Sequence, residues 1–209
     1  MACEYIPKSE RERLSYVWSG DNNEWTEKAE LKFNATEYLF KKKEDDESRS
    51  WRKSEDYFIY RDLTKKGTFD VMTVLSKQYV IQDTLVCQSW KIKNDMREIA
   101  EHICMNASYY DSIREKEIIA WFALDLPFPI GPDKYCGLPG LILEINEANG
   151  AVVYTATSVL LSHEKLEIEK PVVKKKRKVI SFQEYNNIVS KYISECKKMQ
   201  RPYFWGISF

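Results

Sequence analysis

Two carboxylates are the best-placed residues for acid–base chemistry in this sequence. Asp125 lies between two leucines and Glu144 lies within an aliphatic run, so both sit near the ends of expected strands. Two such groups held close together could act as a general acid and a general base. A hydrolase with a site near Asp125, Tyr135 and Glu144 is therefore one hypothesis. The simpler interpretation makes each carboxylate the solvent-facing residue of its strand, and we assign no catalytic residue.

The other nucleophilic and metal-binding residue types do not have the spacing of a known centre. Ser162, His163 and Glu164 are consecutive, and neighbouring strand residues point to opposite faces, so they cannot form a triad by themselves. His102 and Cys104 share a face of an expected strand, but two ligands do not make a zinc site. The chain has two histidines and no CxxC pair. We therefore predict neither a metal nor a cofactor.

A glycine–proline segment at residues 137–140 gives the strongest local signal. Pro139 sets the negative φ of a turn's second position, and Gly140 can adopt the positive φ that a type II turn needs next. We predict a structural turn here, formed by Gly137, Leu138, Pro139 and Gly140. The strand after it should place Leu141, Leu143 and Ile145 on one face, with Ile142 and Glu144 on the other. Asn149-Gly150 then favours a hairpin turn into a returning strand.

Most of the chain consists of short strand patterns separated by turn residues. The expected strands occupy residues 13–19, 29–41, 57–63, 68–75, 79–81, 85–93, 103–110, 117–126, 141–145 and 151–155. The first long one changes its buried parity near Thr36, which indicates a bulge or two short strands. Strands at this spacing without intervening helices predict antiparallel pairing. The predicted fold class is mainly β, a single curved antiparallel sheet over residues 11–170 that is open like a half-barrel.

The C-terminal part of the chain changes to helical periodicity. Ser181 and Glu184 have the spacing of a capping box, and apolar residues then recur at helical intervals as far as Met199. We predict an amphipathic helix over residues 181–199 whose apolar side packs on the sheet. The chain is expected to form a single domain over residues 1–209.

Composition and charge bound the classes of function. The 32 basic residues balance 32 acidic ones, so no overall field attracts nucleic acid. No apolar run approaches the roughly 18 residues of a membrane-spanning helix. The first residues lack the basic and apolar regions of a signal peptide. We expect a folded globular protein with no nucleic-acid partner, no transmembrane segment and no signal peptide in this sequence.

Several motifs around the glycine–proline segment occur in one frame. They are the Trp-Phe-Ala-Leu-Asp-Leu-Pro run at 121–127, Gly131-Pro132, Tyr135 and Gly-Leu-Pro-Gly-Leu-Ile at 137–142. In these motifs the chain resembles the GLPGLI family, secreted or envelope-associated proteins of Bacteroidetes with no assigned activity. Residues 90–92 and 103–107 extend the resemblance upstream. The resemblance implies an extracytoplasmic location, in the periplasm or at the cell surface.

An extracytoplasmic location permits disulfide bonds. The chain has five cysteines, so at least one thiol must remain free. The strands that carry Cys87 and Cys104 could be neighbours, and Cys136 could pair with either of them. We predict at least one bridge among these three cysteines.

The function hypothesis that follows is a non-enzymatic envelope protein. It would bind an apolar or peptide ligand, or a partner protein, between the sheet and the helix. The candidate groove residues are Trp121, Asp125, Tyr135, Glu144 and Tyr154. The alternatives are the hydrolase described above and a purely structural surface protein. A cavity left between the helix and the sheet would favour binding.

Overall fold

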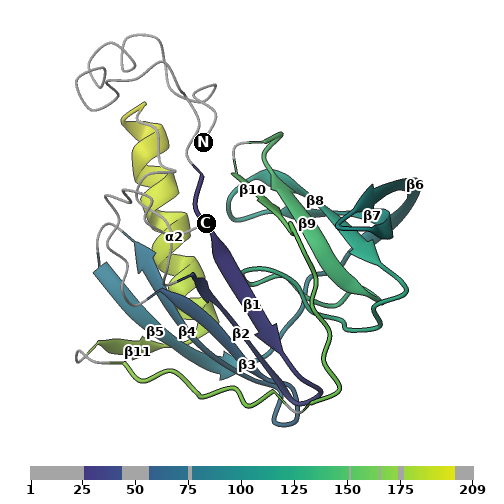
Figure 1. The fold of residues 1–209 in the computed structure, drawn as a ribbon. Helices are drawn as coiled ribbons and strands as arrows, with labels where there is room; N and C mark the ends of the chain where they lie inside the picture. The colour runs from purple at the N-terminus through teal and green to yellow at the C-terminus, as the bar shows by residue number, and fades with distance from the viewer. Residues whose placement is uncertain are drawn as a thin grey trace.

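A computed structural model describes residues 26–43, 57–74, 77–150, 152–164, 166–173 and 177–200. The chain is mainly β, and its C-terminal helix packs on a sheet, as the sequence predicted. The strands form two sheets, where the sequence predicted one (Figure 1). The predicted strand at 13–19 lies outside the described residues. Within the described part, no helix is both long and apolar enough to cross a membrane.

The first sheet has six strands in the order β1-β2-β3-β4-β5-β11. These are β1 (Ala29–Phe33), β2 (Glu37–Lys42), β3 (Phe58–Asp62), β4 (Gly67–Val74), β5 (Lys77–Thr84) and β11 (Lys178–Ile180). The parity change near Thr36 corresponds to two short strands, β1 and β2, which pair with each other. Strand β11 pairs with β5 in parallel, so this sheet is not wholly antiparallel.

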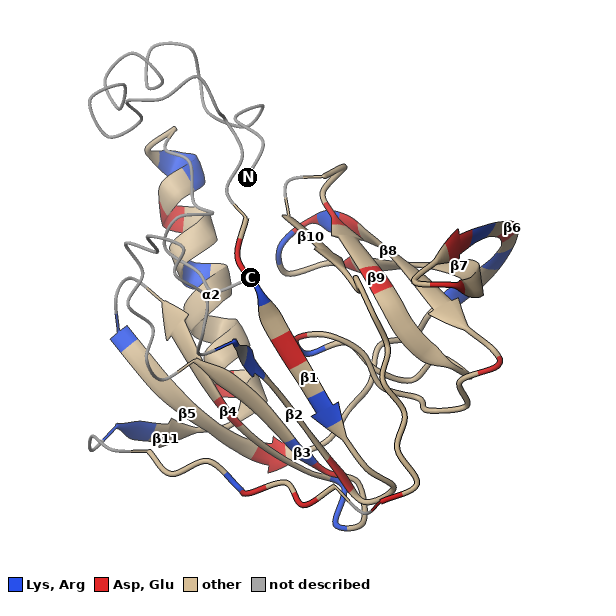
Figure 2. Cartoon of the chain, in the orientation of Figure 1, with Lys and Arg blue, Asp and Glu red and all other residues tan. Residues whose placement is uncertain are grey.

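The second sheet has five antiparallel strands in the order β10-β9-β8-β7-β6. They are β6 (Lys91–Ile99), β7 (His102–Asp111), β8 (Lys116–Ala123), β9 (Leu141–Glu147) and β10 (Val152–Thr155). The predicted hairpin from β9 to β10 is present, and Asn149 and Gly150 in its connection are both at positive φ. Because Glu147 pairs with Val152, the connection is longer than the two-residue turn that the Asn-Gly pair predicted. Charges of both signs are interspersed over both sheets and the helix (Figure 2).

The division into two sheets follows from the segment between β5 and β6. Residues 85–90 were expected to begin a strand, but they form none. Their groups bond to the loop before β9 instead: Gln88 and Trp90 both make side-chain hydrogen bonds to its backbone. These contacts hold the segment against the loop before β9. The chain leaves the first sheet at Thr84 and begins the second at Lys91.

Helix α2 (Phe182–Lys198) lies across one face of the six-stranded sheet (Figure 1). Its N-terminus has the predicted capping box, with Ser181 and Glu184 each accepting from the other's backbone N–H. Asp83 at the end of β5 also accepts a hydrogen bond from the Phe182 N–H at 2.9 Å. The helix buries Tyr185, Val189, Ile193 and Cys196. The capping groups thus fix where the helix begins, and its buried stripe fixes which side faces the sheet.

The six-stranded sheet buries both of its faces. Phe40, Ile59 and Ile81 pack against α2 in one cluster, which we call the inner face. On the outer face, Ile168 packs against a second cluster that includes Val71 and Val80. The long connection from β10 to β11 therefore covers the side of the sheet that α2 leaves open.

A β-bulge in β9 overturns part of the predicted strand alternation. The pairing shifts between Trp121 and Phe122, which oppose Glu144 and Ile142, so Leu143 is an extra residue. As a result Ile145 shares a core cluster with Ile142 rather than with Leu141 and Leu143. The sequence prediction of strict alternation was wrong here, because one inserted residue reverses the parity of all that follow.

We predict that Val189→Asp lowers the free energy of unfolding by about 3 kcal/mol or more, because it buries an unpaired charge against the sheet. Val189 is 0% exposed. The adjacent Ser190 is exposed, so Ser190→Glu should stay within about 0.5 kcal/mol of the parent. Urea unfolding of the three proteins checks this. Equal stabilities for the two variants would show that α2 is not docked.

Candidate functional site

A cavity of about 460 Å³ lies where α2, the end of the six-stranded sheet and the loops of the second sheet meet. Its size falls within the roughly 300–1,000 Å³ range of ligand pockets. Eight of its eleven lining residues are polar or charged (Arg61, Thr68, Asp83, Thr84, Lys134, Gln183, Asn186 and Asn187), and Val86, Ile113 and Phe182 are the apolar ones. Most of the surface that these residues present to the cavity is nevertheless apolar. The helix therefore does not fill the space beside the sheet completely.

Two buried cations belong to the cavity wall. Arg61 is 1% exposed and comes from β3, and Lys134 is 7% exposed and comes from the loop before β9. Arg61 forms an ion pair with Asp70 and donates to the carbonyl of Tyr60. The Lys134 ammonium lies 3.6 Å from a carboxylate oxygen of Asp133. Each cation is therefore neutralised by a neighbouring buried carboxylate, Arg61 by Asp70 and Lys134 by Asp133.

The carboxylates behind these cations join the two sheets. Asp133, from the loop of the second sheet, accepts a hydrogen bond from the Tyr57 hydroxyl beside β3. Burial raises the pKa of Tyr57 well above its usual value, and Asp133 adds to this effect. Burial also raises the pKa of Asp70 to about 6, against the opposing influence of Arg61. The junction between the sheets is therefore polar and shielded from solvent.

A second buried ionic group extends the junction along the five-stranded sheet. Glu147 is 0% exposed, forms an ion pair with Lys116, and accepts a 2.6 Å hydrogen bond from the Tyr135 hydroxyl. Burial would raise the pKa of Glu147, but Lys134 and Lys116 outweigh it and hold the pKa below its usual value. Tyr135 therefore serves as a buried donor in this group.

The five candidate groove residues do not line one groove. Trp121 and Glu144 oppose each other on the same face of the five-stranded sheet. On that face the Arg97 side chain forms an ion pair with Glu144 and its guanidinium lies 4.1 Å from the centre of the Trp121 ring. Tyr154 opposes Ile145, which lies on the other face because it is the next residue along the strand after Glu144. Tyr135 packs in the same cluster as Ile145.

The two carboxylates of the acid–base hypothesis have different partners. Asp125 is bonded to His102 Nδ1 at 2.6 Å, and Glu144 to Arg97 and the Thr155 hydroxyl. Cys104, close to His102 in the chain, is a buried free thiol. Burial raises the pKa of this thiol to about 11, and Asp125 adds to the effect. Such a thiol is protonated at neutral pH and is a poor nucleophile.

The glycine–proline segment is structural in a different way from the one predicted. Positive φ occurs at Gly137 (93°), and the prediction of positive φ at Gly140 was wrong. Gly140 is required for packing instead: a Cβ there would lie 2.1 Å from the carbonyl oxygen of Ala123. A Cβ on Gly137 would lie 2.7 Å from Cys87. Both glycines thus allow the loop to approach other segments closely.

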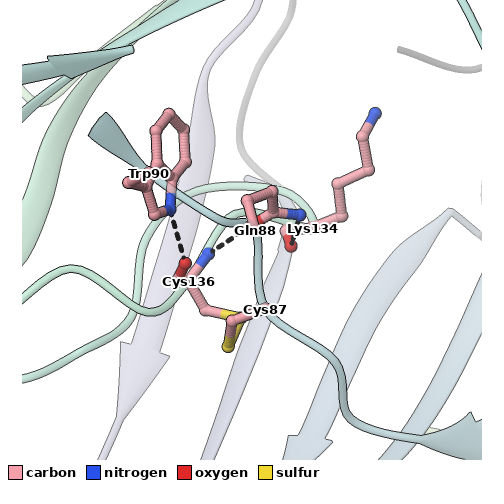
Figure 3. Close-up of a disulfide and its surroundings, with 5 residues drawn as sticks. All are labelled: Cys87, Gln88, Trp90, Lys134 and Cys136. Atoms are coloured by element: carbon pink, nitrogen blue, oxygen red, sulfur yellow. Dashed lines mark hydrogen bonds between the residues drawn. A yellow bond between two sulfur atoms is a disulfide. The ribbon is translucent and has the colours of Figure 1, made fainter. Parts of the chain in front are cut away.

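A disulfide joins Cys87 to Cys136, and Cys104 stays outside it (Figure 3). The same place is tied by three hydrogen bonds: Trp90 Nε1 donates to the Cys136 carbonyl at 2.8 Å, the Cys136 N–H donates to Gln88 at 3.1 Å, and Gln88 donates to the Lys134 carbonyl at 3.3 Å (Figure 3). These bonds fix the backbone of the loop that carries Asp133 and Lys134 to the segment entering the second sheet.

Sequence reasoning did not select the cations of the cavity. Arg61 follows Ile59 by two residues on β3, so strand alternation alone placed it on the inner face beside α2. A charged residue at an inward-facing position of a predicted strand is the sequence signal that could have identified Arg61. Lys134 and Asn186 carried no such signal, because the fold of the loop and the position of the helix bring them to the cavity.

The comparisons with known families and structures indicate a similar fold and give no activity. A family described as "Protein of unknown function (Porph_ging)" matches residues 111–144. Proteins of curated function give no match. The structure of PNGF-II in a P21 crystal form is similar with a TM-score of 0.53 at 16% identity, over 81% of this chain and 30% of that one. Its C2 crystal form gives a TM-score of 0.49 at 18% identity, over 76% and 28%. This chain thus spans less than a third of the PNGF-II chain.

The family match corrects the resemblance drawn from the sequence. The segment that resembled the GLPGLI family, from Trp121 to Ile142, lies within the stretch that matches Porph_ging. No GLPGLI family match accompanies it. The matched stretch contains the loop of Asp133 and Lys134, Cys136 and both glycines discussed above. The motifs read as a family signature are therefore the residues that build this loop.

We predict that Gly140→Ala lowers the free energy of unfolding by about 3 kcal/mol, because the new Cβ overlaps the Ala123 carbonyl. Gly67 provides the matched control, since a Cβ there meets no atom within 4 Å. Gly67→Ala should change stability by less than about 1 kcal/mol. Thermal or urea unfolding measures both. Similar losses for the two variants would contradict the close approach at Gly140.

Proposed function

We propose that this protein is a non-enzymatic binding protein that acts outside the cytoplasm and takes a peptide segment in the cavity beside α2. The observation that carries the proposal is the composition of the wall. Three side-chain amides, from Gln183, Asn186 and Asn187, share it with hydroxyls and one aromatic ring. A side-chain amide donates and accepts at once, which suits the alternating N–H and C=O groups of a peptide backbone.

Peptide is the better-supported half of the original hypothesis. An apolar ligand would remove water from the side-chain amides of Gln183, Asn186 and Asn187 without offering them hydrogen bonds, which is costly for polar groups. A peptide segment can belong to a free peptide or to a partner protein, and the cavity chemistry is the same for both. The cavity also favours binding over a purely structural surface role.

The hydrolase alternative has less support. Asp125 and Glu144 are each engaged by a different basic side chain, His102 and Arg97 respectively. Neither carboxylate lines the cavity. Within the described residues, no three histidine, cysteine, aspartate or glutamate side chains gather into a metal site.

We propose the location outside the cytoplasm on the basis of the Cys87–Cys136 disulfide, since such bonds persist in oxidising compartments. Protein recovered from its native cells, with thiols blocked at lysis, should give the linked Cys87–Cys136 peptide pair in mass mapping. Cys104 and Cys196 should be labelled as free thiols after denaturation. Recovery of Cys87 and Cys136 as blocked thiols would contradict this location.

Binding is tested by titrating isotope-labelled protein with a pool of hexapeptides of randomised sequence and following backbone amide signals. We expect shifts at residues that line the cavity, and loss of those shifts in Asn187→Trp. Asn187 is exposed, so the indole blocks the mouth without disturbing the core.

Ser190→Trp is the control, because Ser190 is exposed on the same helix and does not line the cavity. It should leave the shifts unchanged. No shifts at any lining residue, or equal binding by both variants, would overturn the peptide-binding proposal.

A further inference from the structure

We propose that the cavity beside α2 selects its peptide by one large apolar side chain, that of a leucine or phenylalanine, which packs against Val86, Ile113 and Phe182. We call this peptide residue the anchor. The side-chain amides of Gln183 and Asn187 bond the peptide backbone on either side of the anchor. This inference rests on the proposed peptide-binding function and names the side chain that the cavity recognises.

A ligand can contact only those wall groups that have accessible surface, and the apolar residues have it. Val86 is 78% exposed, and Ile113 and Phe182 are half-buried. Arg61 and Lys134, in contrast, are almost fully buried. This is why the surface presented to the cavity is mostly apolar although most of the lining residues are polar. The part of the wall that a peptide meets therefore favours an apolar group.

The charged residues of the wall do not call for a charged side chain. Arg61 and Lys134 are each neutralised by a buried carboxylate. Asp83 accepts from the Phe182 N–H through Oδ2 at 2.9 Å and from the Thr84 N–H through Oδ1 at 2.7 Å. These backbone bonds, that of Phe182 first, hold the pKa of Asp83 below its usual value. Because each charge already has a partner within the protein, the anchor is uncharged.

The backbone on both sides of Val86 is fixed before a ligand binds. The Leu85 N–H donates to the carbonyl of Lys66 at 2.6 Å. Cys87 is joined to Cys136 by the disulfide (Figure 3). An exposed apolar side chain on a fixed backbone can contact the anchor without rearrangement of the protein, which lowers the entropy cost of binding.

The other two apolar residues are fixed by carboxylates that accept from their backbone. The Ile113 N–H donates to Asp111 Oδ1 at 2.9 Å, and the Phe182 N–H donates to Asp83. The Phe182 ring also packs against that of Tyr185, with 6.4 Å between the ring centres. The apolar part of the wall thus comes from three separate segments that are each held in place, so it is formed in advance of the ligand.

Gln183 and Asn187 supply hydrogen bonds for the peptide backbone beside the anchor. Both are exposed and line the cavity, and their spacing of four residues places them next to each other on one side of α2. Each side-chain amide can donate and accept. An isolated apolar compound would remove water from these amides without replacing its hydrogen bonds, whereas a peptide offers its own N–H and C=O groups. The wall therefore suits an apolar side chain that is carried on a peptide backbone.

The test compares four hexapeptide pools on the wild-type chain. Both termini are blocked, and the pools are randomised in the same way except at the third residue, which is leucine, phenylalanine, serine or lysine. Amide titration should give about tenfold tighter binding for the leucine and phenylalanine pools than for the serine pool. The lysine pool should bind no more tightly than the serine pool. Isopentanol, as a source of the isolated apolar group, should compete only weakly with the leucine pool.

Two exposed valines supply a second readout. Val86→Ser should lower affinity for the leucine pool about fivefold and leave the serine pool unchanged, because it removes apolar surface from the wall. Val172→Ser is the matched control, since Val172 is 82% exposed and does not line the cavity. It should leave the affinity for both pools unchanged. The amide spectrum of each variant checks that it is folded, and the pool comparison needs only the wild-type chain.

The outcomes separate the two proposals. Equal affinity for the leucine, phenylalanine and serine pools, or tightest binding by the lysine pool, would overturn the apolar anchor and leave peptide binding intact. Competition by isopentanol as strong as that by the leucine pool would also overturn it, since the apolar group alone would then suffice. Equal effects of Val86→Ser and Val172→Ser would overturn the contact of the anchor with Val86. Absence of binding by every pool would overturn both proposals.

Discussion

The structure depends on how it compensates a cation that is almost wholly removed from water. Arg61 faces the space between the two sheets and the helix, where a lone charge would be prohibitively unfavourable. Asp70 on the neighbouring strand neutralises it, and Asp133, from the other sheet, lies close enough to influence both Asp70 and the Tyr57 hydroxyl. A buried ionic group of this kind adds little to net stability but is satisfied in few arrangements. It therefore determines how the loop before β9 must sit against the first sheet.

The loop before β9 is consequently the most constrained part of the chain. Its backbone approaches Ala123 so closely at Gly140 that no side chain fits. Four residues earlier, at Cys136, the loop is joined to the segment after β5 by the disulfide. Asp133 and Lys134 come just before this point, and the Lys134 carbonyl is itself bonded to Gln88. The candidate site thus follows from the way the two sheets are joined, and its amide wall is added by α2.

Local patterns predicted the elements of this fold better than their assembly. The hairpins, the capping box at Ser181 and the apolar stripe of α2 depend on residues near in sequence, so the sequence revealed them. The break between the two sheets lies where Gln88 and Trp90 bond to a loop 46 to 48 residues away. The bulge at Leu143 and the packing role of Gly140 likewise depend on a partner strand. The candidate site combines strand, loop and helix residues, and so it could not be found from spacing. Arg61 was the exception, because strand parity alone marks it as an inward charge.

The segments that cover the six-stranded sheet are synthesised after its strands β1 to β5, and this order affects folding during synthesis. The inner face is covered by α2 and the outer face by the connection that contains Ile168. A ribosome completes strands β1 to β5 long before either cover emerges, so both apolar faces wait exposed while more than eighty residues are added (residues 85–167). Exposed faces and open strand edges at that stage are prone to association with other chains. Strand β11 and α2 then pack onto the sheet together. Their contacts join residues that are far apart in sequence, so this step is expected to be slow. The nascent chain is expected to depend on protection by a chaperone over this interval.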